Sequence, residues 1–166
     1  MQGGRDCWVA KYEKDRKRQE MGFEDTNYRP EFNEYACLVA KTVSLRSEDA
    51  DTKVGACVLN DENRILSVGY NGFPKGWKRN SSWSRDDKLN HVIHAEQNAF
   101  SMLKRDEKPC LIGLTHSPCI ACAREIVNYG IKEVWYLQEY HRETLFKEVF
   151  DHYGIKYGQI IPKTAF

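Results

Sequence analysis

Two hydrophobic periods along the chain predict its helices and strands. The segment 31–46 carries apolar residues at helical spacing on one face: Phe32, Tyr35, Ala36, Val39 and Val43. The segment 54–59 is almost continuously apolar, which is typical of a buried strand. After a short polar turn, 65–70 predicts a second strand, so the two segments form a β-hairpin.

Beyond residue 90 the pattern alternates between helix and strand three times. We expect helices over 94–104, 119–129 and 142–153, with strands over 111–115, 133–137 and 156–161. Residues 71–90 show no periodicity and predict a long loop, of the kind that often carries function. A hairpin followed by such alternation predicts an α/β fold: a single three-layer α/β/α domain, with a mixed five-stranded sheet and helices on both faces.

Composition places this domain at 30–166, after a polar N-terminal extension over 1–29. Within the extension, 9–18 is dense in charges of both signs and is either a solvated helix, which we favour, or a mobile arm. The first residues form no apolar signal segment, and no run of 18 apolar residues occurs, so we expect a cytoplasmic protein without a membrane partner. The six cysteines are then expected as thiols and metal ligands. A net charge of +1 argues against a nucleic acid polymer as partner.

The chemistry is concentrated in two short motifs. His94-Ala95-Glu96 is followed 22 residues later by Pro118-Cys119-Ile120-Ala121-Cys122. His94, Cys119 and Cys122 are zinc-type ligands, and a three-ligand site leaves zinc a fourth position for water, as in catalytic centres. Zinc lowers the pKa of water to about 7, and Glu96, which need not be a ligand, is placed to move protons. This pattern is the signature of zinc-dependent nucleobase deaminases.

Alternative interpretations of the cysteines explain less. A Cys-x-x-Cys motif alone is also half of a structural zinc site or a redox pair. A structural zinc site would require another pair of ligands. A redox pair would leave His94 and Glu96 without a role. A further zinc site built from His91 and other cysteines has no tight ligand spacing, so we expect these thiols to be buried: Cys37, Cys57 and Cys110.

Longer stretches match a known family. They are Arg46-Ser47-Glu48-Asp49 with 52–57, Gly69-Tyr70-Asn71-Gly72 with 73–76, 94–99, 117–123 and 130–134. Through them the chain, from about residue 31 to its end, resembles the deoxycytidylate (dCMP) deaminases of the zinc-dependent cytidine deaminase superfamily. The resemblance implies a zinc-dependent hydrolase that converts dCMP to dUMP and ammonia, a precursor step for thymidylate synthesis.

The resemblance also implies a substrate site. Zn²⁺ would be bound by the three ligands, with Glu96 as the proton shuttle. Val54 would wall the base pocket, and the Ala56 backbone N–H would donate to cytosine O2. The Ser117 backbone carbonyl would accept from the exocyclic amine, and Asn71 would contact the sugar hydroxyl.

The 5′-phosphate is a separate question. Arg46, at the entrance to the pocket strand, is our candidate for it, against the alternative of a solvated arginine at a helix end. A second basic group interleaved with tryptophans is either a phosphate clamp or a solvated loop: Trp77, Lys78, Arg79, Trp83, Arg85 and Lys88.

Regulated members of this branch bind dCTP, an activator, or dTTP, an inhibitor. The resemblance assigns that effector site to a segment of four residues: Gly69, Tyr70, Asn71 and Gly72. Mg²⁺ would accompany the bound effector, and a homohexamer is the favoured assembly.

Three positions depart from the family pattern. His91 stands where an aromatic residue is common, and Ser117 stands where a large aromatic often precedes the Pro-Cys pair. Gln97 stands where an aliphatic residue usually follows the glutamate. Competing functions therefore stay open: a deaminase of dCTP, cytidine or another cytosine compound, a tRNA or single-stranded DNA base deaminase, and an inactive zinc-stabilised scaffold.

Overall fold

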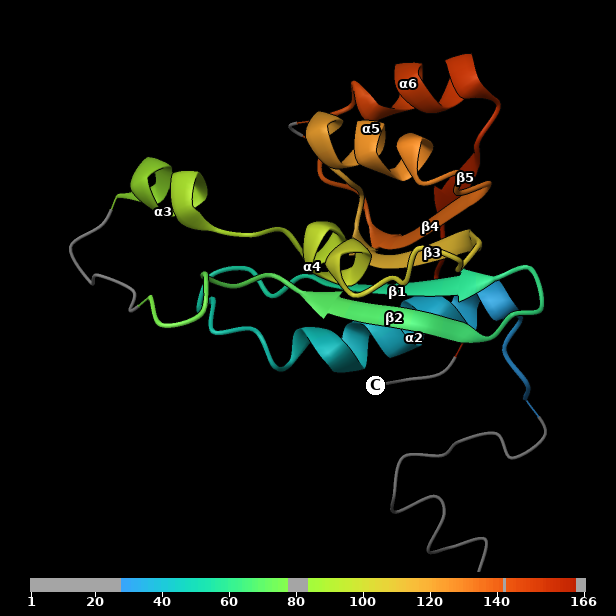
Figure 1. Ribbon diagram of the computed structural model, residues 1–166, viewed down its shortest axis with the longest axis horizontal. Coiled ribbons are helices and arrows are strands. Elements are labelled where there is room, and N and C mark those ends of the chain that lie inside the picture. The colour runs from blue at the N-terminus through green and yellow to red at the C-terminus, as the bar shows by residue number, and fades with distance from the viewer. Residues whose placement is uncertain (1–27, 78–83, 142, 164–166) are drawn as a thin grey trace, which may run out of the picture. The chain divides into compact units, whose positions relative to one another are not determined.

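The computed structural model describes residues 28–77, 84–141 and 143–163, except for the side chains of 85 and 86 (Figure 1). Glu31–Ile161 forms one compact unit. Its elements, in chain order, are α2 (Phe32–Ser44), β1 (Gly55–Asn60), β2 (Ile65–Tyr70), α3 (Arg85–His91), α4 (Ala95–Ser101), β3 (Pro109–His116), α5 (Ile120–Asn128), β4 (Glu133–Gln138), α6 (Phe146–Tyr153) and β5 (Lys156–Gln159).

The five strands form a single mixed sheet in the order β2-β1-β3-β4-β5. β1 pairs antiparallel with β2, to which a tight turn joins it, and also pairs antiparallel with β3 on its other edge. β3, β4 and β5 run parallel, because a helix separates each from the next. The predicted hairpin and mixed five-stranded sheet are confirmed.

Helices cover both faces of this sheet, as the sequence predicts (Figure 1). On one face, Ala36 and Ala40 of α2 pack on Cys57 and Leu59 of β1. On the other face, apolar residues of α4, α5 and α6 form the larger core with the inward side chains of β1, β3 and β4. α2 lies close to the sheet because β1 begins with Gly55, where a Cβ would lie 2.0 Å from the Ala40 carbonyl oxygen.

The prediction of a loop throughout 71–90 is wrong for α3, which occupies Arg85–His91. Ser84 caps this helix: its hydroxyl accepts from the Asp87 N–H at 3.1 Å, and the Asp87 carboxylate accepts from the Ser84 N–H at 3.1 Å. Such a Ser-x-x-Asp capping box, a variant of the usual Ser/Thr-x-x-Glu motif, was the available sequence signal for the helix. Helices as short as this one make too few turns for a hydrophobic periodicity to reveal them.

The remaining residues, Met1–Pro30 and Pro162–Phe166, group as a second unit, of which 28–30 and 162–163 are described. In it, Lys163 Nζ lies 5.8 Å from the centre of the Tyr28 ring. The helix predicted over 9–18 lies outside the described residues. In the part of the chain that the structure describes, every helix is too short or too polar to cross a membrane.

Candidate active site

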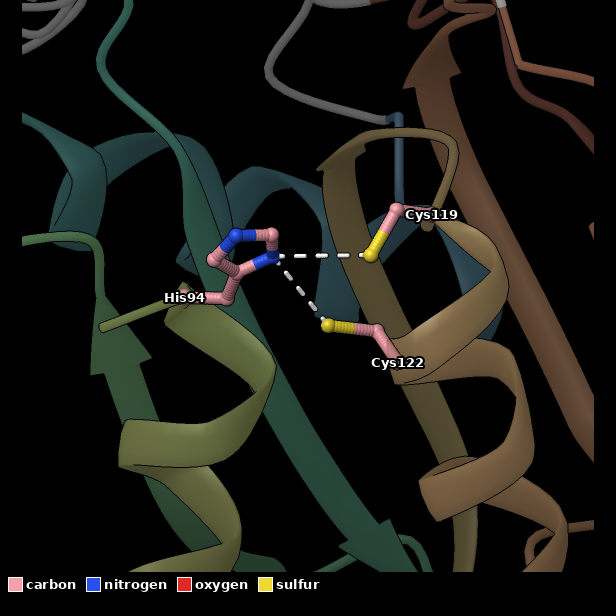
Figure 2. Close-up of side chains that lie close together, drawn as sticks. All are labelled: His94, Cys119 and Cys122. Atoms are coloured by element: carbon pink, nitrogen blue, oxygen red, sulfur yellow. Dashed lines mark hydrogen bonds between the residues drawn. The ribbon is translucent and has the colours of Figure 1, made fainter. Parts of the chain in front are cut away.

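The three predicted zinc ligands converge at the starts of two helices (Figure 2). His94 immediately precedes α4, Cys119 immediately precedes α5, and Cys122 lies in the first turn of α5. His94 Nδ1 is 3.6 Å from Cys119 Sγ and 3.3 Å from Cys122 Sγ, and the three ligand atoms all lie within 4.8 Å of one another. A tetrahedral zinc with Zn–N of about 2.1 Å and Zn–S of about 2.3 Å holds its ligand atoms roughly 3.5–3.8 Å apart. The donor set and its spacing therefore fit zinc.

Hydrogen bonds among the three ligand groups shift the pKa of each of them. The hydrogen bond from Cys122 lowers the pKa of Cys119 to about 4, and His94 adds to this effect against the opposing influence of burial. The same hydrogen bond, together with burial, raises the pKa of Cys122. Hydrogen bonding with Cys119 raises the pKa of His94, and the charges of Glu96, Cys119 and Glu125 contribute further. A divalent cation would favour the thiolate forms of both cysteines and the neutral form of His94, and would release protons as it binds.

Glu96 is buried beside this group, with 4% of its surface exposed. Burial raises the pKa of its carboxyl, although His94 and a hydrogen bond with Cys122 oppose the rise. A raised pKa brings a carboxyl closer to the pH at which it both takes up and releases a proton, which is the property that a general acid and base requires.

A cavity of about 550 Å³ opens onto His94, Glu96 and Cys119. Three of the predicted substrate residues line it: Val54, Asn71 and Ser117. The other two do not. Ala56 is fully buried within β1, and Arg46 is exposed beyond the end of α2. The roles assigned to all five stay predictions.

Asn71 builds the wall of this cavity through its side-chain amide. Its Oδ1 accepts from the Val54 N–H at 2.8 Å, and its Nδ2 donates to the Thr52 carbonyl at 2.9 Å and to Asp49 Oδ2 at 3.3 Å. The amide therefore fixes the chain over 49–54 against the end of β2. This tie places Val54 at the edge of the cavity.

An ion pair that the sequence does not predict faces the same cavity. Lys88 Nζ on α3 lies 2.6 Å from Asp49 Oδ1 and 2.9 Å from Asp51 Oδ2. The sequence predicts Lys88 only as one of several cations in this segment. Of these, Lys78 and Arg79, like Trp83, lie outside the described residues. The partners are 39 residues apart in the chain, and no local pattern connects them.

The segment predicted to bind effectors, 69–72, lies against the residues that flank His94. A Cβ on Gly69 would lie 2.2 Å from the Ala95 carbonyl oxygen, so the glycine permits β2 to approach α4. Gly72 and Ile93 exchange two backbone hydrogen bonds, with N···O distances of 3.1 and 2.8 Å. Close packing thus accounts for Gly69, whereas a Cβ on Gly72 would meet only a Tyr70 side-chain atom at 4.0 Å, and the effector role stays a prediction.

The remaining cysteines form no second metal group within the described residues. The expected burial is wrong for Cys110, which is only partly buried. Cys37 and Cys57 are fully buried between α2 and the sheet, and burial raises the pKa of each to about 12. Such neutral thiols behave as small apolar side chains.

Comparison with known proteins decides the family. Residues 30–138 match the cytidine and deoxycytidylate deaminase zinc-binding region. The chain belongs to this family. It is 37% identical over 147 residues to the deoxycytidylate deaminases of Pongo abelii and Homo sapiens, and in both cases the match covers 81% of this chain and 83% of the relative. The crystal structure of dCMP deaminase from cyanophage S-TIM5, in complex with dCMP and dUMP, superposes with a TM-score of 0.69 at 33% identity, over 81% of this chain and 100% of that one.

Family membership confirms the resemblance, the fold class and the enzyme class predicted from the motifs. The protein is a zinc-dependent deaminase, and its His/Cys/Cys group has the donors that a zinc site requires.

Proposed function

We propose that this deaminase hydrolyses dCMP to dUMP and ammonia. The observation that carries the proposal is the convergence of three zinc ligands and a buried Glu96 on one cavity of about 550 Å³, which is large enough for a mononucleotide. The S-TIM5 enzyme, which was solved with dCMP and dUMP, supports this substrate class. The product is the precursor for thymidylate synthesis.

The residues of the site can perform each proton transfer that the reaction requires. Zinc held by His94, Cys119 and Cys122 would supply hydroxide at neutral pH by lowering the pKa of water to about 7. Glu96 takes the proton that the water loses and delivers it to N3 of the base. After oxygen has added to C4, Glu96 would take the remaining proton from that oxygen and pass it to the amine. The C4–N bond then breaks, which leaves ammonia and the C4 carbonyl of dUMP. Burial of Glu96 favours its protonated form and so supports both deliveries.

We place the base and sugar on the cavity wall. The cytosine ring packs against Val54, its O2 accepts from the Ala56 N–H, and its exocyclic amine donates to the Ser117 carbonyl. The sugar hydroxyl donates to the second lone pair of Asn71 Oδ1, since the first accepts from Val54. Three of these four residues line the cavity, which supports the arrangement.

Two cations are proposed for the 5′-phosphate. Lys88 lines the cavity, and its ammonium group has three N–H donors, two of which are directed at Asp49 and Asp51. Arg46 is the second cation. It precedes Ser47, whose hydroxyl donates to the Asn71 carbonyl at 2.8 Å, so the Arg46 backbone is held near the rim of the site.

We further propose that dCTP with Mg²⁺, or dTTP, acts at 69–72, and that the enzyme assembles as a homohexamer. The Gly72–Ile93 pairing ends one residue before His94. On the other side, Asn98 Nδ2 donates to the Tyr70 carbonyl at 2.7 Å. A ligand that shifts this segment would therefore act on both sides of a zinc ligand.

The test is ammonia release from dCMP, CMP, deoxycytidine and dCTP, each with and without dCTP–Mg²⁺ or dTTP. Turnover selective for dCMP supports the proposal, and a response to the effectors supports the regulatory part. Selective turnover of another compound would overturn dCMP as substrate. No turnover in zinc-loaded protein would favour a polynucleotide deaminase or an inactive scaffold.

A further inference from the structure

A second polar contact joins the two helices that carry the zinc ligands. Gln97 on α4 accepts a hydrogen bond through Oε1 from the His94 backbone N–H at 3.2 Å. Its Nε2 donates to Glu125 Oε1 on α5 at 3.3 Å. One side chain therefore connects the backbone of His94 to the helix that begins next to Cys119 and contains Cys122.

Both ends of the Gln97 amide are required for this arrangement. The backbone N–H needs an acceptor, and the carboxylate needs a donor. If the amide were reversed, its NH₂ group would face the backbone N–H and its oxygen would face the carboxylate. An aliphatic residue, which the family resemblance leads us to expect here, could make neither contact. A glutamate could accept from the N–H, but would repel the carboxylate of Glu125.

The contact between Gln97 and Glu125 lies in a partly buried region, where hydrogen bonds help to hold the helices together. Both side chains are half-buried, and α4 and α5 pack directly against each other beside the zinc site. Metal sites depend on groups of this kind, because partners behind the ligands fix the spacing that the metal demands; their loss typically costs 10–100-fold in metal affinity.

We propose that Gln97 and Glu125 form a positioning bridge that fixes α4 against α5 and thereby slows the loss of zinc from His94, Cys119 and Cys122. The inference rests on the proposed function, in that it takes zinc to be the metal of the site. The bridge acts on ligand spacing, and neither residue lines the cavity.

The experiment measures zinc release from the full-length holoenzyme into excess chromogenic chelator, with competition titrations for affinity. We expect Q97M and E125M each to accelerate release about 10-fold or more, because each breaks the bridge with a side chain of similar length. E125Q keeps an acceptor for Gln97 Nε2 and should stay within about threefold of wild type. In the double variant Q97M/E125M, the effect should be smaller than the product of the two single effects, because both remove the same contact.

Controls separate the bridge from charge and from general stability. Glu148 is exposed on α6, so E148M tests the loss of a helix carboxylate elsewhere and should release zinc at the wild-type rate. Thermal unfolding of the zinc-free proteins shows whether a variant is merely unstable, and the proposal requires faster release without a matching fall in apo stability.

Several results would overturn the bridge. Wild-type release from Q97M would do so, and so would fast release from E125Q, which would show that the carboxylate charge alone matters. Wild-type protein that binds no zinc would instead overturn the proposed function itself, so the two failures are distinguishable.

Discussion

Replacement of Lys88 by methionine tests the ion pair that attaches α3 to the cavity. Met has a similar length and removes only the charge and the donors. The side chains of Lys88 and Asp49 are 10% and 5% exposed, so the substitution leaves a buried carboxylate without its cation. Asp51 is 66% exposed, so its ion pair with Lys88 contributes little to the free energy of unfolding in comparison.

The expected cost follows from what Asp49 retains. Removing one partner of a buried ion pair typically destabilises by about 3–5 kcal/mol. Asp49 keeps the backbone N–H bonds from Asp51 and Thr52, at 2.9 and 3.2 Å, which partly satisfy its charge. We therefore expect K88M to lower the free energy of unfolding by about 3 kcal/mol, the lower end of this range. In a domain of this size that corresponds to a fall in Tm of roughly 6–12 °C.

Urea unfolding of K88M, D49N and K88M/D49N measures this cost. The double variant should recover about 1 kcal/mol or more relative to K88M, because the buried group no longer carries a charge. K132M, which removes an exposed lysine, is the matched control and should unfold like wild type. A K88M protein within about 1 kcal/mol of wild type, or a double variant no more stable than K88M, would refute the buried-pair reasoning.

Three further predictions concern catalysis, packing and pH. E96Q should retain zinc, measured by metal analysis, but lose at least about 10²–10⁴-fold in turnover; near-normal turnover would exclude the proton shuttle. G69A should destabilise by about 1–3 kcal/mol in urea, because its Cβ meets α4 backbone, whereas G72A meets only a Tyr70 side-chain atom at 4.0 Å and should cost less. Burial would raise the pKa of Asp49, but the bonds from Lys88 and backbone N–H groups lower it below its ordinary 3.8. The ionised Asp49 carboxylate therefore stabilises the folded state above pH 3.8, and this stabilisation should be lost as the pH falls through the lower pKa that Asp49 has in the folded protein. An acid unfolding profile unchanged in K88M would contradict this.

The zinc ligands could be predicted from sequence because each motif is local. His94 and Glu96 are two residues apart, and Cys119 and Cys122 are three apart at the start of a helix. Spacing of this kind is set by the geometry of a single turn, so the residue types alone indicate their joint use. The hairpin was predictable for a similar reason, since it depends on neighbouring segments.

The contacts that shape the cavity are not local, and this is why sequence analysis missed them. Lys88 and Asp49 meet only because α3 and the 45–54 connection lie on the same side of the cavity. Gln97 was visible as a departure from the family, but its partner is 28 residues away and carries no motif of its own. Periodicity predicts which face of an element is apolar, and does not predict which polar groups meet across elements.

One carboxylate connects the parts of the proposed substrate site. Asp49 accepts from Lys88, the proposed phosphate ligand, and from Nδ2 of Asn71, whose Oδ1 holds the Val54 N–H at the base pocket. A phosphate that draws Lys88 toward itself would therefore act on the same carboxylate that positions the pocket wall. A nucleoside lacks this contact and would leave Lys88 fully engaged with Asp49 and Asp51. The selectivity for a monophosphate would then arise from a network shared between the two ends of the substrate, since Asp49 contacts Lys88 directly and is linked to Val54 through Asn71.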